Sequence, residues 1–210
     1  MQYRTLGRTG VRVSEVGIGG AQFGIPNYMG RWDPYTEDAQ RATTATIHRA
    51  LELGYTYVDT APGYGNGRSE EMVGVALKGH RDQVFLATKV SGGQWLPDAI
   101  RASVEASLRR LQTDVIDLYQ IHRSDPEVPW EETLSALTDL VRQGKVRYLG
   151  CSTNDRPAQG QPRLPAWEIV ETLALSERRG FERFASLQPP YSLLRRTVET
   201  EYLPMCQRHG

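Results

Sequence analysis

Cysteine is scarce in this chain of 210 residues, which contains only Cys151 and Cys206. Two cysteines cannot form the disulfide framework of a small secreted protein or supply the ligand quartet of a structural zinc site. Apolar runs of the roughly 18 residues that a membrane helix needs are also missing. The first segment, MQYRTLGRTG, lacks the apolar stretch of a secretory signal peptide. These absences predict a soluble, cytoplasmic protein without a metal site.

An excess of charge of either sign is missing as well, because 25 Lys and Arg residues balance 25 Asp and Glu residues. Without a basic surplus, the composition gives no reason to expect binding to nucleic acid or to an acidic membrane. Charged residues make up 24% of the chain and hydrophobic residues 39%, which is ordinary for a globular protein. We therefore predict one globular domain over residues 1–210.

The apolar residues alternate between short β-branched runs and longer segments of helical period. After a hairpin signal at Gly7-Arg8-Thr9-Gly10, each of six predicted strands precedes a helical stretch. This alternation is typical of βα units with parallel strands. The strands are expected at residues 15–18, 56–59, 84–88, 115–121, 146–152 and 186–188, and the helices at 37–53, 69–77, 97–111, 130–143, 166–179 and 200–208.

Both a doubly wound sheet and a (β/α)8 TIM barrel fit this order of elements. Two features favour the barrel: the hairpin could plug one end, and the turn at residues 17–20 lacks the third glycine of a dinucleotide-binding fingerprint. We therefore predict an α/β fold of the (β/α)8 TIM-barrel type. A complete barrel has eight βα units in typically about 250 residues. Because only about six are found before Gly210, we expect a barrel truncated at its C-terminal end.

Polar residues lie at the ends of five consecutive predicted strands. In a parallel barrel these positions share the rim at the carboxyl ends of the strands, where barrel enzymes have their active sites. Each residue alone has a plain structural explanation, such as a turn, a cap or a solvated charge, but together they indicate a site. Tyr64, in the loop after the second strand, can fold over the same rim. The five residues are Asp59, Lys89, His122, Ser152 and Gln188.

Several segments resemble the signature segments of the aldo-keto reductase family, and they occur in the same order along essentially the whole chain. A single such segment would be weak evidence, but three separated ones that bring Asp, Tyr, Lys and His to one rim are strong evidence. These three are residues 59–71 (DTAPGYGNGRSEE), 88–90 (TKV) and 117–122 (DLYQIH); residues 17–20, 144–152 and 188–193 also resemble their family counterparts.

The resemblance implies that the protein reduces aldehydes or ketones by hydride transfer from a nicotinamide cofactor, usually NADPH. It makes Tyr64 the general acid and Asp59, Lys89 and His122 the other members of a catalytic tetrad. A phenol has an ordinary pKa of about 10, and a neighbouring ammonium favours its phenolate form. In these roles Asp59 would keep Lys89 charged, and His122 would polarise the substrate carbonyl.

The resemblance also places Gly20, Ser152 and Gln188 in the cofactor site. The family usually has Asn directly after this serine, whereas here Thr153 follows and Asn154 comes one residue later. Either Asn154 makes the contact through a shifted turn or the contact is lost, and the Ser152 hydroxyl could also simply satisfy the end of its strand. The choice of NADPH over NADH rests on the family alone.

Two alternatives to a reductase acting on a small carbonyl substrate stay open. One is a non-catalytic family member that serves as a binding or regulatory subunit, although the intact tetrad argues against it. The other is an inactive truncated fragment. In a truncated barrel the first and sixth strands would each have an unpaired edge. We therefore expect the isolated 210-residue chain to be poorly soluble or oligomeric and to bind NADPH weakly or not at all.

Overall fold

A computed structural model describes residues 1–28, 30–90, 95–121, 127–153 and 164–210. Six strands form one curved, fully parallel sheet in which the strand order follows the sequence. The predicted alternation of strand and helix is therefore confirmed, and the first and sixth strands are the two edges of this sheet. The strands are β3 (Ile18–Gly19), β4 (Tyr57–Asp59), β5 (Phe85–Lys89), β6 (Ile116–Ile121), β7 (Val146–Ser152) and β8 (Phe184–Gln188).

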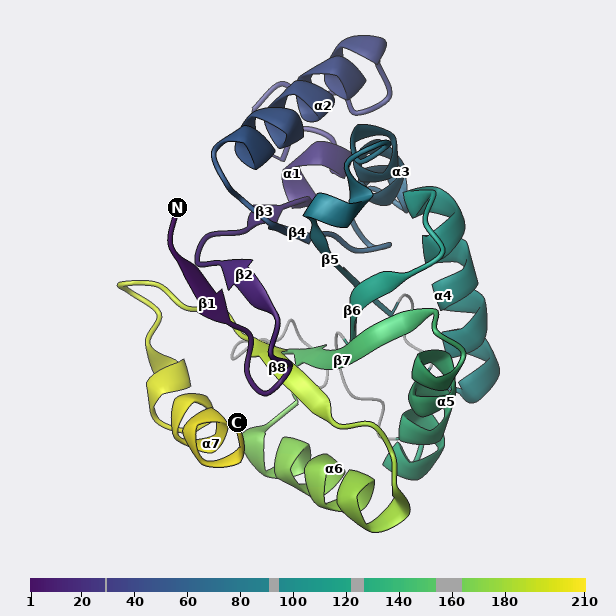
Figure 1. The fold of residues 1–210 in the computed structure, drawn as a ribbon, viewed down its shortest axis with the longest axis vertical. Helices are drawn as coiled ribbons and strands as arrows, with labels where there is room; N and C mark the ends of the chain where they lie inside the picture. The colour runs from purple at the N-terminus through teal and green to yellow at the C-terminus, as the bar shows by residue number, and fades with distance from the viewer. Residues whose placement is uncertain (29, 91–94, 122–126, 154–163) are drawn as a thin grey trace.

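The helices follow one another around the convex side of the sheet (Figure 1). Together the curved sheet and its helices make a half-barrel, which confirms the prediction of an incomplete (β/α)8 barrel. Three short elements were not predicted: α1 (Ala21–Gly24) and the 3-10 helices Arg81–Gln83 and Thr197–Glu199. The longer helices are α2 (Glu37–Glu52), α3 (Arg68–Ala76), α4 (Pro97–Leu111), α5 (Trp130–Arg142), α6 (Ala166–Arg179) and α7 (Tyr202–His209).

Successive residues of each strand face opposite sides of the curved sheet, as the pleat requires. On the convex side, Leu86, Tyr119 and Leu149 belong to the large apolar core that the helices cover. On the concave side, Ala87 and Leu118 belong to a separate, smaller cluster. Beyond this small cluster, toward the carboxyl ends of the strands, the concave face carries polar side chains.

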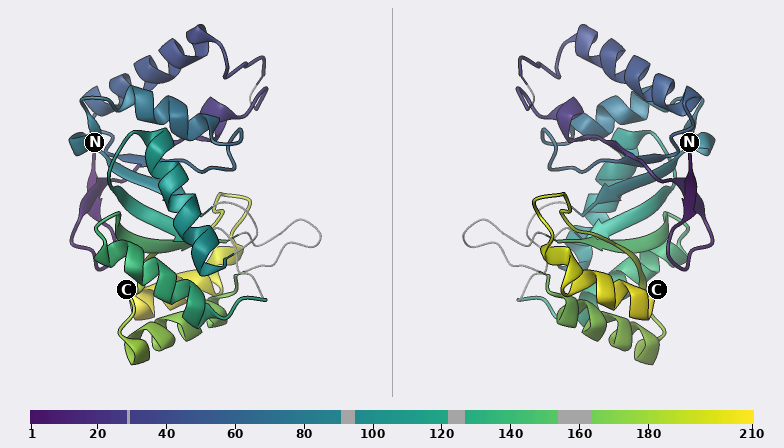
Figure 2. Two further views of the ribbon diagram at one scale, coloured as in Figure 1. Left: turned by 90° about the vertical axis from the view of Figure 1, so that its right-hand side faces the viewer. Right: turned by 90° about the vertical axis from the view of Figure 1, so that its left-hand side faces the viewer.

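An antiparallel hairpin of β1 (Tyr3–Thr5) and β2 (Arg12–Ser14) closes the other end of the concave side. Val13 of the hairpin packs with Phe85, at the start of β5, and the Tyr148 hydroxyl donates to the Thr9 carbonyl at 3.3 Å. Figure 2 shows the hairpin, in dark purple, at one end of the strands. The predicted plug is therefore confirmed, and the opposite end holds the carboxyl ends.

The first strand of the sheet differs from its predicted position at residues 15–18. It comprises only Ile18–Gly19, because the preceding residues still belong to the hairpin region. The Glu15 amide donates to the Gln2 carbonyl at 3.0 Å, and the Val16 side chain is exposed. Alternating apolar residues in a hairpin and in a sheet strand have the same period, so the pattern alone does not separate them.

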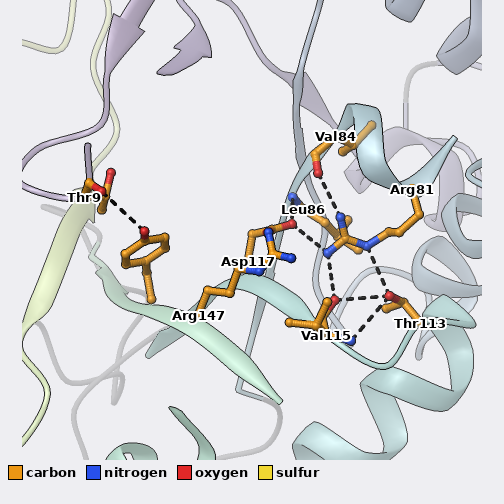
Figure 3. Close-up of polar contacts among 9 residues, drawn as sticks. Thr9, Arg81, Val84, Leu86, Thr113, Val115, Asp117 and Arg147 are labelled. Carbon is orange, nitrogen blue, oxygen red and sulfur yellow. Dashed lines mark hydrogen bonds and ion pairs between the residues drawn. The ribbon is translucent and has the colours of Figure 1, made fainter. Parts of the chain in front are cut away.

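Asp117 links three neighbouring strands near their amino ends (Figure 3). Its buried carboxylate accepts from Arg81 Nη2 at 2.6 Å, from the Leu86 amide at 2.9 Å and from Arg147 Nη1 at 2.8 Å. Arg81 also donates to the Val115 carbonyl at 2.7 Å. These partners lie in or beside β5, β6 and β7. One carboxylate therefore connects the three strands at this end of the half-barrel.

Among the described residues, no helix is both long enough and apolar enough to cross a membrane.

Candidate functional site

Asp59 and Lys89 form a buried ion pair at the carboxyl ends of β4 and β5. Lys89 Nζ lies 2.8 Å from both carboxylate oxygens of Asp59 and donates a third hydrogen bond to the Thr60 carbonyl at 3.0 Å. Lys89 is 2% exposed and Asp59 is 7% exposed. Three acceptors match the three protons of the ammonium, so this desolvated cation is fully paired.

Tyr64 brings a phenol ring to this ion pair from the loop after β4. Lys89 Nζ lies 5.1 Å from the centre of the Tyr64 ring. The loop is held by backbone hydrogen bonds, since the Tyr64 amide donates to the Ala61 carbonyl at 3.1 Å and the Gly67 amide donates to the Pro62 carbonyl at 2.7 Å. The structure thus brings together three of the four residues predicted as the tetrad.

The loop that holds Tyr64 has no space for a side chain at its next residue. Gly65 has φ of +66°, and a Cβ atom there would lie 1.9 Å from the Gly24 carbonyl oxygen. A substitution at Gly65 would therefore be both strained and blocked by backbone. The close contact between this loop and α1 therefore fixes the position of the Tyr64 main chain.

Ser69 and Glu70, which follow this loop, have structural roles. Helix α3 begins at Arg68, one residue before the predicted start at residue 69, and no side chain caps it. The Ser69 hydroxyl instead donates to the Gly20 carbonyl at 2.7 Å. Glu70 is fully buried and pairs with Arg110 of α4. Tertiary partners override the local capping pattern here.

A side-chain amide continues the site toward β8. Gln120 of β6 is fully buried, and its Nε2 donates to Asp59 Oδ1 at 3.1 Å and to Gln188 Oε1 at 3.2 Å. A cavity of about 410 Å³ on the concave side is lined by Asp59, Gln120 and Gln188 as well as by hairpin residues. The sequence did not single out Gln120, although it lies two positions before His122 in the motif DLYQIH.

Two of the predicted cofactor residues already have partners within the protein. The Gly20 amide donates to the Asp59 carbonyl at 2.7 Å, and a Cβ at Gly20 would lie 2.8 Å from Ser69 Oγ. The Ser152 hydroxyl donates to the Gln188 main-chain carbonyl at 3.0 Å. Of the other predicted residues, His122 and Asn154 lie outside the described residues.

Two other tyrosines of the sheet, half-buried Tyr57 and buried Tyr119, differ from Tyr64 in their surroundings. Burial raises the pKa of Tyr57 well above its usual range, and the charge of Asp59 raises it further. Burial likewise raises the pKa of Tyr119, which lies on the convex side and donates to Ser103 of α4 at 2.9 Å. Both phenols therefore stay protonated near neutral pH.

Cys151 is also unsuited to chemistry. It is buried in the convex core, and burial raises the pKa of its thiol well above the usual range. A thiol that stays protonated is a poor nucleophile. Cys151 therefore packs as a small buried hydrophobic residue.

A half-barrel of parallel βα units with a buried carboxylate–ammonium pair at the carboxyl ends of its strands is an architecture of the βα-barrel class, whose enzymes have their active sites at this end. The sequence model of the aldo/keto reductase family matches residues 15–210. The chain belongs to the aldo/keto reductase family, a family of oxidoreductases.

Individual relatives agree with this assignment. The chain is 38% identical over 214 residues to the aldo-keto reductase YhdN of Bacillus subtilis (strain 168), covering 97% of this chain and 58% of YhdN. It is 39% identical over 185 residues to the methylglyoxal reductase YeaE of Escherichia coli (strain K12), covering 86% of this chain and 59% of YeaE. The chain thus spans less than two thirds of the length of these curated relatives.

The fold agrees with a solved structure of the same family. A crystal structure of a thermostable aldo-keto reductase in complex with the inhibitor epalrestat superposes with a TM-score of 0.83 at 34% sequence identity. The superposition covers 100% of this chain and 70% of that chain. The half-barrel described here therefore corresponds to the larger part of that fold.

Proposed function

We propose that the protein reduces aldehydes or ketones to alcohols with a hydride supplied by NADPH, and that Tyr64 is the general acid. The observation that carries this proposal is that the Lys89 ammonium lies 2.8 Å from the Asp59 carboxylate and 5.1 Å from the centre of the Tyr64 ring. Hydride addition to a carbonyl leaves an alkoxide that must be protonated. A phenol beside a fixed cation is suited to give up that proton.

Each residue has a distinct part in this scheme. Asp59 keeps Lys89 charged and in place, and Lys89 stabilises the phenolate that Tyr64 becomes when it donates its proton. His122 would donate a hydrogen bond to the substrate oxygen, a role that rests on the family resemblance. The buried position of the ion pair keeps water from screening its charge.

The side chains around the site fit a nicotinamide carboxamide in part. Gln188 accepts from Gln120 through Oε1, so its own amide nitrogen is the donor that it presents. Ser152 uses its hydroxyl proton on the Gln188 carbonyl and keeps its lone pairs for a donor. Within the proposal, Gln188, Ser152, Asn154 and Gly20 hold NADPH, which supplies the hydride when bound.

The direct test measures NADPH consumption by the full-length protein with a panel of small aldehydes and ketones that includes methylglyoxal. We expect turnover with at least one carbonyl. If NADPH binds but no carbonyl is reduced, the protein is a binding or regulatory subunit and the proposed activity is wrong. If NADPH does not bind at all, the proposed cofactor is wrong.

Replacing Lys89 by Met should lower the rate of reduction. The variant removes the cation that lies 5.1 Å from the centre of the Tyr64 ring and that, in the proposed scheme, stabilises the phenolate formed when Tyr64 gives up its proton. The measurement is kcat/KM for reduction. Lys78→Met is the matched control, because Lys78 is an exposed lysine. A kcat/KM unchanged by Lys89→Met would show that Lys89 does not support Tyr64.

A further inference from the structure

Gln120 contacts both halves of the proposed site although no catalytic or cofactor role is assigned to it. It lies beside Lys89 in the register between β5 and β6. Its amide nitrogen is within hydrogen-bond distance of Asp59, which holds the ammonium, and of Gln188, which faces the proposed cofactor. The buried Gln120 amide therefore connects Asp59, which holds Lys89 beside the proposed proton donor, to Gln188, which is proposed to bind NADPH.

The charge on Asp59 determines which way the Gln120 amide points. A carboxylate only accepts hydrogen bonds, so the end of the amide that faces Asp59 Oδ1 must be the nitrogen. The second proton on that nitrogen then points to Gln188, whose oxygen must be the atom that faces it. Through these two bonds Asp59 fixes the Gln188 amide with its own nitrogen available as a donor.

The remaining atom of Gln120 supports this reading. Its Oε1 is buried and has no hydrogen-bond partner among the described residues. Leaving a buried acceptor unpaired is unfavourable, and an apolar side chain of similar size would avoid this penalty. The value of a polar side chain at this position therefore lies in the two hydrogen bonds that its nitrogen donates. Its oxygen is left unpaired because Asp59 fixes the orientation of the amide.

We propose that Gln120 is a positioning residue that orients the Gln188 amide toward the nicotinamide carboxamide, and so couples cofactor binding to the Asp59–Lys89 pair. This inference rests on the proposed function, because it gives Gln188 the nicotinamide as its ligand. Gln120 itself need not touch cofactor or substrate. Its contribution is to keep Gln188 from rotating by half a turn and presenting oxygen to the oxygen of the carboxamide.

The first test is equilibrium binding of NADPH, followed by tryptophan fluorescence, in the Gln120→Leu variant. Leucine removes both donors and keeps an apolar side chain of similar reach, so the fold is retained. We expect NADPH to bind about tenfold more weakly, the effect of losing one well-oriented hydrogen bond. Unchanged affinity in a parent protein that does bind NADPH would overturn the positioning role and leave the proposed function intact.

The matched control is Tyr119→Phe, one residue earlier on the same strand. Tyr119 faces the convex core and loses a single buried hydrogen bond to Ser103 in this variant. We expect a loss of stability at this position with no change in NADPH affinity. If Tyr119→Phe weakens NADPH binding as much as Gln120→Leu does, a general loosening of β6 explains both, and the positioning role is wrong.

A double-mutant cycle separates orientation from bulk structure. In a Gln188→Leu background there is no amide left to orient, so adding Gln120→Leu should change NADPH affinity less than twofold. Full additivity of the two substitutions would overturn the proposal, since Gln120 would then act independently of Gln188.

A third measurement needs no cofactor. In ¹⁵N-labelled free protein, Gln120→Leu should shift the side-chain amide resonances of Gln188, because their hydrogen-bonded neighbour is lost, whereas Tyr119→Phe should leave them in place. If the Gln188 resonances shift but the parent does not bind NADPH, the amide link exists and the proposed function is the part that fails. If they do not shift, the link itself is wrong.

Discussion

A Tyr64→Phe variant of the full-length protein should lose carbonyl reduction by a factor of about 10²–10⁴, the range typical of general acid catalysis. Only the hydroxyl is removed, and the ring keeps its place over Lys89. NADPH affinity should therefore stay within about twofold of the parent, because no contact to the proposed cofactor residues changes. The measurement is kcat and KM for reduction, together with a separate NADPH titration.

Tyr57→Phe is the matched control for this experiment. Tyr57 lies on the same concave face, two residues before Asp59, but burial keeps its phenol protonated. We expect this variant to reduce carbonyls at close to the parent rate. Turnover of Tyr64→Phe within a few-fold of the parent would remove Tyr64 from the role of proton donor.

Replacing Asp117 by Ala should lower the free energy of unfolding by about 3–5 kcal/mol, as expected when one partner of a buried ion pair is removed. The carboxylate is 2% exposed and accepts three hydrogen bonds, two of them from arginines. Its loss leaves the Leu86 amide without this acceptor and removes a side-chain hydrogen bond between β6 and β5. Urea denaturation followed by circular dichroism measures the change.

Arg147→Met tests whether the effect belongs to the buried carboxylate. The Arg147 side chain is 60% exposed, so its ion pair with Asp117 should contribute less than about 1 kcal/mol. An Asp117→Ala protein that unfolds at the same urea concentration as Arg147→Met would contradict the central place given to this carboxylate.

Helix positions could be predicted closely because local sequence marks them. Pro97 begins α4 as expected, and Gly180, with φ of +68°, ends α6 in the left-handed conformation that glycine favours. Strand ends were also well placed where polar residues follow apolar runs, as at Asp59 and Lys89. These signals lie within a few residues of the feature that they predict.

The features that sequence reasoning missed depend on partners far along the chain. Gln120 contacts Asp59 and Gln188, which lie 61 and 68 positions away. The Ser69 hydroxyl donates to the Gly20 carbonyl, 49 positions away. Only the register of neighbouring strands and the approach of the loops reveal such contacts. Hydrophobic period carries no information about them.

The alternation of β6 between two faces also bears on how this protein can diverge. Tyr119 packs against the helical layer, whereas the next residue, Gln120, lies on the concave face and donates to Asp59 of the proposed site. Substitutions on the convex face of β6 affect mainly the stability of the fold. Substitutions on its concave face affect mainly the proposed catalytic site. Along a single strand, selection for a new substrate and selection for a stable chain therefore act on alternate residues, so either property can change while the other is preserved.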